Sequence, residues 1–152
     1  MIVPKRTICK ANRDDISAIF AFDSEGTKAG RREFIRRAVD SGNAHILQEE
    51  GEAIALGILE YTFFEHGFIS LVYVNQQERR TGVGEMLLRY LMSICRTPKL
   101  FSSTNLSNVP MQTLFAKVGF ESSGIIHNLH PKDPEVIYYK ALRAGEQTTW
   151  VN

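Results

Sequence analysis

The stretch that decides the fold reads VNQQERRTGVG and covers residues 74–84. It follows a hydrophobic run that predicts a strand, and it leads into the clearest helical pattern of the chain, which begins at Val83. A loop with two glycines and two arginines at such a junction can hold a phosphate. Glycine lets the backbone approach an anion closely, and the first N–H groups of a helix have no internal partner. A plain surface turn would also use these glycines, so the loop alone leaves both interpretations open.

Two common nucleotide-binding motifs can be tested against the same residues. A dinucleotide-binding fingerprint requires a third glycine where this chain has Leu87. A P-loop requires lysine and then serine or threonine after the last glycine, but Gly84 is followed by Glu85 and Met86. The loop therefore lacks the specific contacts of both classes.

The rest of the chain alternates between strand and helix patterns. Strands are predicted over residues 2–9, 44–48, 53–64, 67–74, 99–103, 120–127 and 136–141. Helices are predicted around residues 16–20, 31–39, 83–94 and 110–118, with Pro110 suited to a first turn and Gly119 to a left-handed cap. The order is strand, two helices, three strands, helix, strand, helix and two strands, which predicts an α/β (α+β) fold.

Size, charge and cysteine content exclude several classes of protein. The 152 residues suit one domain, predicted over residues 1–143, followed by a polar tail at 144–152. The net charge of +1 is too small to drive nonspecific nucleic-acid binding, and no run is long enough to span a membrane. Cys9 and Cys95 lack zinc-site spacing, so no metal is expected. With no signal peptide at the start, we expect a cytoplasmic protein.

Two patterns together make the chain resemble the GNAT superfamily of acyl-coenzyme A dependent N-acetyltransferases. The pyrophosphate loop of that family reads Gln/Arg-x-x-Gly-x-Gly/Ala, which Arg79, Gly82 and Gly84 match. A second family pattern has asparagine, an aromatic residue seven positions later, and then Gly-Phe. It is matched by Asn108, Phe115 and the pair Gly119-Phe120. The resemblance covers nearly the whole chain.

The resemblance implies a mixed, mainly antiparallel central sheet of about seven strands, splayed between the fourth and fifth strands and flanked by four helices. It implies acetyl-CoA as the cosubstrate, with the pantetheine arm bonded along the end of the fourth strand as an added strand would be. The residues expected to bind the cofactor are Val72, Tyr73, Val74, Arg79, Arg80, Thr81, Gly82, Val83, Gly84, Asn108, Met111 and Phe115.

The chain departs from the family at two positions that carry chemistry. The aromatic residue of the second pattern is often a tyrosine that donates a proton to the departing thiolate, but here it is Phe115. A glutamate base that some members place on the fourth strand is replaced by Phe68. We therefore take His127, Glu60 and Tyr73 as the candidate catalytic residues, with proton removal through water as an alternative.

The expected activity is direct transfer of an acetyl group to a primary amine of a small molecule or protein. The alternative is a module that senses acyl-CoA without turnover. The arginines at 31, 32, 36 and 37 either form a solvated helix face or attract an acidic acceptor. A homodimer is expected from the resemblance alone, and the sequence does not identify the acceptor.

Overall fold

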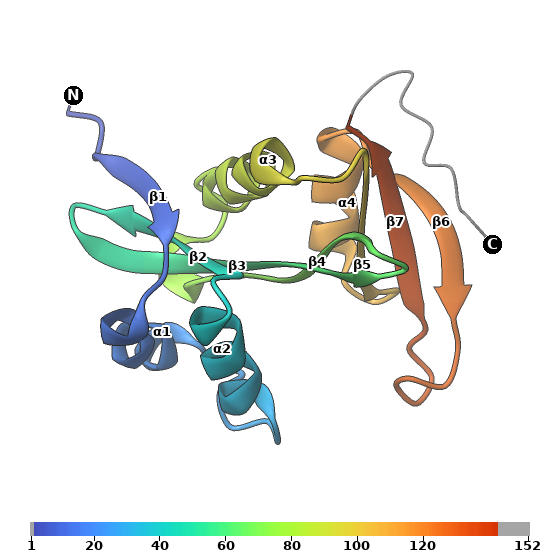
Figure 1. Cartoon of the computed structure of the whole chain (residues 1–152), viewed down its shortest axis with the longest axis horizontal. Helices are drawn as coiled ribbons and strands as arrows, with labels where there is room; N and C mark the ends of the chain where they lie inside the picture. Colours follow the sequence, from blue (N-terminus) through green and yellow to red (C-terminus); the bar gives the residue numbers. More distant parts are fainter. Residues whose placement is uncertain (1, 143–152) are drawn as a thin grey trace. The chain divides into compact units, whose positions relative to one another are not determined.

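The computed structural model describes residues 2–142, so the tail expected at 144–152 lies outside the described residues (Figure 1). The strands are β1 (Arg6–Lys10), β2 (Ala44–Glu49), β3 (Glu52–Phe63), β4 (His66–Val74), β5 (Lys99–Asn105), β6 (Glu121–Ile126) and β7 (Glu135–Ala141). The helices are α1 (Ile16–Phe22), α2 (Arg31–Asp40), α3 (Val83–Ile94) and α4 (Val109–Lys117). Two short 3₁₀ turns are η1 (Arg13–Asp15) and η2 (Gln76–Glu78).

The strands form one seven-stranded sheet in the order β1-β2-β3-β4-β5-β7-β6. β4 and β5 run parallel, whereas β1 with β2, β2 with β3, β5 with β7 and β6 with β7 are antiparallel. This confirms the predicted mixed, mainly antiparallel sheet with four helices. The registered pairing of β4 with β5 ends at Ile69 and Ser102, before β4 itself ends at Val74.

The chain divides into two compact units. The first comprises Met1–Leu59 and Leu71–Leu91, and the second comprises Glu60–Ser70 and the chain from Met92 onward. In the first unit, α1 and α2 cover one face of β1, β2 and β3, while α3 covers the other (Figure 1). The buried residues that form the core on the α1 and α2 side include Ile19, Ile35, Ile46 and Ile58. Each such side chain contributes about 1.5–3 kcal/mol when it leaves water.

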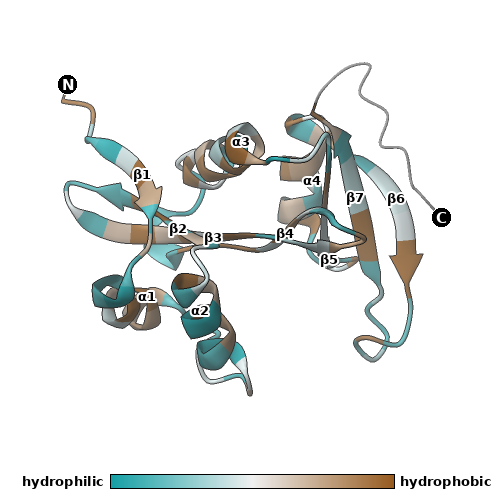
Figure 2. Cartoon of the chain, in the orientation of Figure 1, coloured by the Kyte–Doolittle hydropathy of each residue, from teal (hydrophilic) through white to brown (hydrophobic). Residues whose placement is uncertain are grey.

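Helix α3 packs closely on the sheet because one strand position carries no side chain. A Cβ atom at Gly57 of β3 would lie 2.8 Å from Leu91 Cδ1 of α3. Around this contact, α3 buries Val83, Leu87 and Leu88. Figure 2 shows β3 as hydrophobic over most of its length, as expected for a strand covered on both faces. The beginning of α3, where the predicted anion site lies, is therefore held by the core.

The second unit is built on β5, β7 and β6, with α4 packed on this part of the sheet. Phe115 of α4 is fully buried, and its ring stacks on that of Tyr138 in β7 with the centroids 4.7 Å apart. The Phe120 ring, just beyond α4, lies 5.1 Å from the Phe115 ring. These aromatic contacts place α4 on the sheet.

The first strand is shorter than the sequence predicts. It was expected over residues 2–9 but forms only from Arg6. Ile2 and Val3 are 94% and 83% exposed, so their apolar side chains gain nothing from a sheet there. Pro4 has no N–H group to donate to a neighbouring strand.

The buried His45 of β2 makes stability sensitive to acid. Burial, and then the nearby charge of Lys10, lower the pKa of its imidazole below the ordinary value of 6.5. The unfolded chain therefore binds a proton more readily than the folded chain, and stability falls as pH drops below about 6.5. We expect His45→Phe to flatten this decline between about pH 6.5 and 5, measured by urea unfolding at several pH values. An unchanged pH dependence would assign the effect to other groups, such as His66, whose pKa is also lowered by burial.

Candidate functional site

The loop between β4 and α3 has the backbone shape of an anion site. Asn75 begins it, since its side-chain oxygen accepts a hydrogen bond from the Gln77 N–H (3.3 Å) and so caps η2. Arg80 and Gly82 then adopt left-handed conformations, with φ of 66° and 83°. A left-handed arginine is uncommon because its Cβ crowds the backbone. The loop thus has a defined backbone conformation, and the left-handed conformation of Arg80 costs some conformational free energy.

The N-terminus of α3 opens beside this loop. The Gly82 carbonyl accepts the first helical hydrogen bond from Met86 N (3.0 Å), so the N–H groups of the first turn have no partner within the helix. A Cβ atom built on Gly82 would meet nothing within 4 Å. The acidic residue in the first turn, Glu85, is paired with Arg89 (3.4 Å). Free N–H groups, the positive end of the helix dipole and open space are what a phosphate requires.

Three hydrogen bonds fix the loop from within the first unit. Arg6 Nη1 donates to the Thr81 carbonyl (3.1 Å), and Thr81 Oγ1 donates to the Glu78 carbonyl (2.6 Å). Arg79 Nε donates to the carbonyl of Val74, the last residue of β4 (3.1 Å). By contrast, the Arg80 side chain is exposed and makes no hydrogen bond or ion pair with any residue that the structure describes.

Tyr73 is the centre of a group of contacts that we call the Tyr73 cluster. Its members are Phe22, Asp23, Ser24, Arg31, Tyr73 and Arg79. Tyr73 is only 9% exposed, and its hydroxyl accepts a hydrogen bond from Ser24 N (3.1 Å) and also contacts Ser24 Oγ. These contacts with Ser24 fix the position of the hydroxyl. Val72 and Val74, on either side of it in β4, are half-buried.

The sequence did not indicate this cluster. Ser24 and Asp23 lie in the connection between α1 and α2, far from Tyr73 along the chain, and no motif links them. Arg31, which was expected on a solvated face or an acceptor rim, instead forms a two-pronged pair with Asp23 at 3.0 and 3.1 Å. The guanidinium groups of Arg32 and Arg36 lie over the Phe20 ring. Arg32, Arg36 and Arg37 nevertheless remain exposed, as on a solvated helix face.

The second family pattern lies wholly in the second unit. The Asn108 side chain caps α4 by accepting a hydrogen bond from Met111 N (3.2 Å). Gly119 ends the helix in a left-handed conformation (φ 95°), where a Cβ atom would lie 2.8 Å from Lys140 Nζ. With Phe115 in the core, each residue of the pattern has a structural task. Met111 is half-buried beside the cap.

The candidate proton-transfer residues of the second unit differ in exposure. His127 is exposed directly after β6, and Glu60 is half-buried within β3. Phe68, at the place of the family glutamate, packs its ring 5.0 Å from that of Phe63. Among residues 2–142, no group of three or more His, Cys, Asp or Glu side chains is arranged to hold a metal ion.

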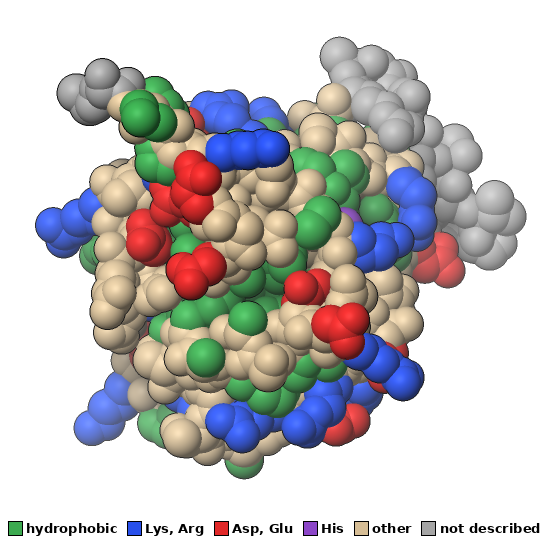
Figure 3. Space-filling view, turned by 90° about the vertical axis from the view of Figure 1, so that its left-hand side faces the viewer, with side chains coloured by type: hydrophobic (Ala, Val, Ile, Leu, Met, Phe, Trp, Pro, Cys, Tyr) green, Lys and Arg blue, Asp and Glu red, His purple; other side chains and the backbone are tan. Residues whose placement is uncertain are grey.

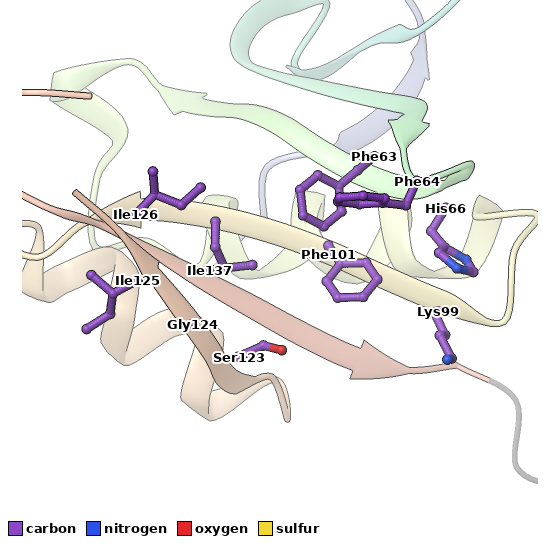
Figure 4. Close-up of a pocket in the computed structure, with 10 residues that line it drawn as sticks. All are labelled: Phe63, Phe64, His66, Lys99, Phe101, Ser123, Gly124, Ile125, Ile126 and Ile137. Carbon is purple, nitrogen blue, oxygen red and sulfur yellow. The ribbon is translucent and has the colours of Figure 1, made fainter. Parts of the chain in front are cut away.

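Each unit also contains a cavity. The cavity of the second unit, of about 470 Å³, is mostly apolar, and Figure 4 shows Phe63, Phe64 and Phe101 grouped in it. Lys99 and His66 are the lining residues that carry or can take up a charge. The pKa of His66 is lowered, mainly by burial and secondly by the positive charge of Lys99. Such a lining suits an apolar ligand better than a phosphate.

The cavity of the first unit, of about 600 Å³, is more polar and carries carboxylates from Asp14, Asp15, Glu52 and Glu78. The face drawn in Figure 3 has acidic side chains gathered beside an apolar strip, with Lys and Arg toward the edges. None of the helices that the structure describes has the length and apolarity needed to cross a membrane.

Comparisons with known proteins agree with this architecture. Residues 11–120 match the family model described as the acetyltransferase (GNAT) family. A GNAT-family acetyltransferase from Bacillus cereus is 36% identical, with a TM-score of 0.84 over 90% of this chain and 97% of that one. The ribosomal-protein-S18-alanine N-acetyltransferase of Escherichia coli is 18% identical, with a TM-score of 0.76 over 96% and 100% of the two chains.

A third solved structure is YncA of Salmonella typhimurium, determined with its cofactor acetyl-CoA. It is 15% identical, with a TM-score of 0.71 over 91% of this chain and 95% of that one. At this identity, as with the Escherichia coli enzyme, the likeness concerns the fold. No curated protein sequence matches the chain.

Proposed function

Since the chain belongs to the GNAT family of acetyltransferases, we propose that it transfers the acetyl group of acetyl-CoA to a primary amine of a small molecule or a protein. The observation that carries the proposal is the loop before α3. It combines left-handed Arg80 and Gly82, the free N–H groups of a helix N-terminus and open space at Gly82. These features fit the pyrophosphate of acetyl-CoA by size and charge.

The residues proposed for cofactor binding have separate tasks. The backbone from Arg79 to Gly84 would hold the pyrophosphate, and the exposed Arg80 side chain would add positive charge. The backbone of Val72 and Val74, past the last registered pair with β5, would bond the pantetheine amides. Asn108 and Met111, at the start of α4, are proposed as cofactor contacts from the family resemblance alone. Phe115, which is buried, would support α4 rather than touch the cofactor.

The reaction itself needs two proton movements. The nitrogen of a neutral amine attacks the thioester carbonyl carbon, an N–C bond forms, the C–S bond breaks, and the sulfur leaves as a thiolate. The attacking amine loses one proton to a base, and the thiolate gains one from an acid or from solvent. His127 and Glu60 are the candidate bases, and Tyr73 is the candidate acid.

We expect one of two variants, His127→Gln or Glu60→Gln, to lower kcat by about 10²- to 10⁴-fold, because general base catalysis contributes an effect of that size. The affinity for acetyl-CoA, measured by calorimetry, should stay the same in both. His130→Gln, which changes an exposed histidine three residues further along, is the matched control and should keep the wild-type kcat. If both candidate variants retain kcat within about threefold, deprotonation through water takes the place of a protein base.

The decisive experiment is to measure release of free coenzyme A from acetyl-CoA by the purified protein. It should be screened over polyamines, amino acids, aminoglycosides and peptides with free N-termini. Release that depends on one class of amine, with the acetylated amine detected by mass spectrometry, would establish the activity and name the acceptor class. Tight binding of acetyl-CoA with no turnover on any amine would contradict the proposal and indicate a sensor.

Two further expectations belong to this proposal. A cytoplasmic location would give the protein access to acetyl-CoA, and it can be tested by cell fractionation. A homodimer, expected from the family resemblance, can be tested by sedimentation of the purified chain.

A further inference from the structure

We infer that Arg79 is a positioning residue: it fastens the loop before α3 to the end of β4 through Tyr73 and Val74, and it is Arg80 that offers its charge to the ligand. The part that concerns the ligand rests on the proposed function, because the ligand is acetyl-CoA. The fastening of the loop does not, because it is a property of the free protein.

Tyr73 joins three segments of the first unit. Its ring stacks with that of Phe22, at the end of α1, with an interplanar angle of 14°. Its hydroxyl bonds to Ser24 in the connection between α1 and α2. The guanidinium carbons of Arg31 and Arg79 lie 5.5 and 5.2 Å from the ring centroid, within the range of cation–π attraction. The Tyr73 ring therefore contacts both Arg31, at the start of α2, and Arg79, in the loop before α3.

The two arginines on this ring are held in different ways. Arg31 is paired with Asp23, a buried carboxylate that also accepts a hydrogen bond from Glu25 N (3.1 Å). The positive charge of Arg31 is thus balanced by the carboxylate of Asp23. No carboxylate lies within ion-pair distance of Arg79 among residues 2–142, and its Nε instead bonds the Val74 carbonyl. Arg79 is therefore fixed by a backbone group and a ring.

This arrangement uses what is particular to an arginine. The flat guanidinium stacks on the ring while Nε, in the same plane, donates to a carbonyl. A lysine has the charge but neither the plane nor the Nε donor. Both arginines are exposed. With Nε bonded to the Val74 carbonyl, Arg79 has one N–H group fewer to donate to a phosphate, whereas Arg80 keeps all of its own. Arg79 thus fixes the loop, and Arg80 supplies the positive charge for the ligand.

The first test uses the free protein and measures hydrogen exchange of two amides that are hydrogen-bonded at the ends of the loop, Glu78 N (to the Asn75 carbonyl) and Met86 N (to the Gly82 carbonyl). We expect Arg79→Gln and Arg79→Lys to accelerate exchange there by about tenfold or more, because the loop loses its fastening. Arg80→Gln, the matched control, should change it by less than about twofold. If Arg79→Lys exchanges like the wild type, charge alone suffices at this position and the inference is overturned.

A second pair of variants asks whether the fastening runs through the ring. Tyr73→Phe keeps the stack and loses only the bond to Ser24, so exchange in the loop should stay close to the wild type. Tyr73→Leu removes the stack and should accelerate exchange as Arg79→Gln does, and the double variant should add little to either. Fully additive effects in the double variant would mean that the two residues act independently, which contradicts the inference. Melting temperatures within a few degrees of the wild type would show that the variants remain folded.

The third test measures acetyl-CoA affinity by calorimetry over a range of salt concentrations. We expect Arg79→Gln to weaken binding by about tenfold with little change in the salt dependence, since its guanidinium is held by the Val74 carbonyl and the Tyr73 ring. Arg80→Gln should reduce the salt dependence itself. The opposite pattern would make Arg79 the phosphate ligand and overturn the inference. If the wild type fails to bind acetyl-CoA, the proposed function fails, and hydrogen exchange still decides the role of Arg79.

Discussion

Replacing Gly82 by tryptophan is expected to weaken acetyl-CoA binding by more than about 100-fold. Each hydrogen bond from the protein to a charged phosphate oxygen is worth about 1.5–3 kcal/mol, and the bulky ring would prevent at least two of them. The side chain has room in the free protein, since a Cβ atom at Gly82 meets nothing within 4 Å. The tryptophan would fill the space in front of α3 without disturbing the core. Titration calorimetry with acetyl-CoA measures the effect directly.

The chain offers a closely matched control for this variant. Gly51, in the turn between β2 and β3, has φ of 84° against 83° for Gly82, and a Cβ atom there also meets nothing within 4 Å. Gly51→Trp therefore carries the same backbone strain, about 1–2 kcal/mol, in a turn outside the loop of residues 79–84, on the wall of the cavity that residues 75–78 also line. It should bind acetyl-CoA as the wild type does. Equal affinity in the two tryptophan variants would show that the loop before α3 does not hold the cofactor.

Truncating Phe115 to alanine is expected to lower the free energy of unfolding by about 3–5 kcal/mol, the usual cost of removing a buried aromatic side chain. The residue is fully buried between α4 and the sheet, against Tyr138 and Phe120. Urea unfolding measures the change as a shift in midpoint. Phe64→Ala serves as the control, because Phe64 is 70% exposed, and it should cost less than about 0.5 kcal/mol.

The conservative variant Phe115→Tyr separates packing from chemistry at the same position. Similar proteins often have a catalytic tyrosine there, but the ring of Phe115 is buried in this chain, and an added hydroxyl without a partner would cost about 1–3 kcal/mol. We expect lower stability and no increase in kcat. A gain in kcat of tenfold or more would mean that the hydroxyl reaches the thioester sulfur, and the position would then be catalytic rather than structural.

Most of the fold could be predicted from periodicity and turn residues. Helix α3 begins and ends where its apolar stripe does, at Val83 and Ile94, because that stripe is the face buried on the sheet. Strand ends were harder to predict. The fifth strand was predicted to end at residue 103, but β5 continues through Thr104 and Asn105 because its pairing with β7 extends to Asn105. Pairing partners, which decide where a strand stops, are distant in the sequence.

The sequence by itself determined the family, the order of the elements and the loop of residues 79–84, because these depend on local patterns and short spacings. Only the tertiary structure decided what the side chains around that loop do. The sequence pattern singles out Arg79 but does not say what its side chain contacts. In the structure Arg79 bonds the Val74 carbonyl and lies over the Tyr73 ring, whereas Arg80 makes no such contact within the described chain. Ser24 and Arg31 contact Tyr73, and Asp23 pairs with Arg31, only when the chain is folded. Side-chain contacts of this kind follow from packing between distant segments, and no local pattern encodes them.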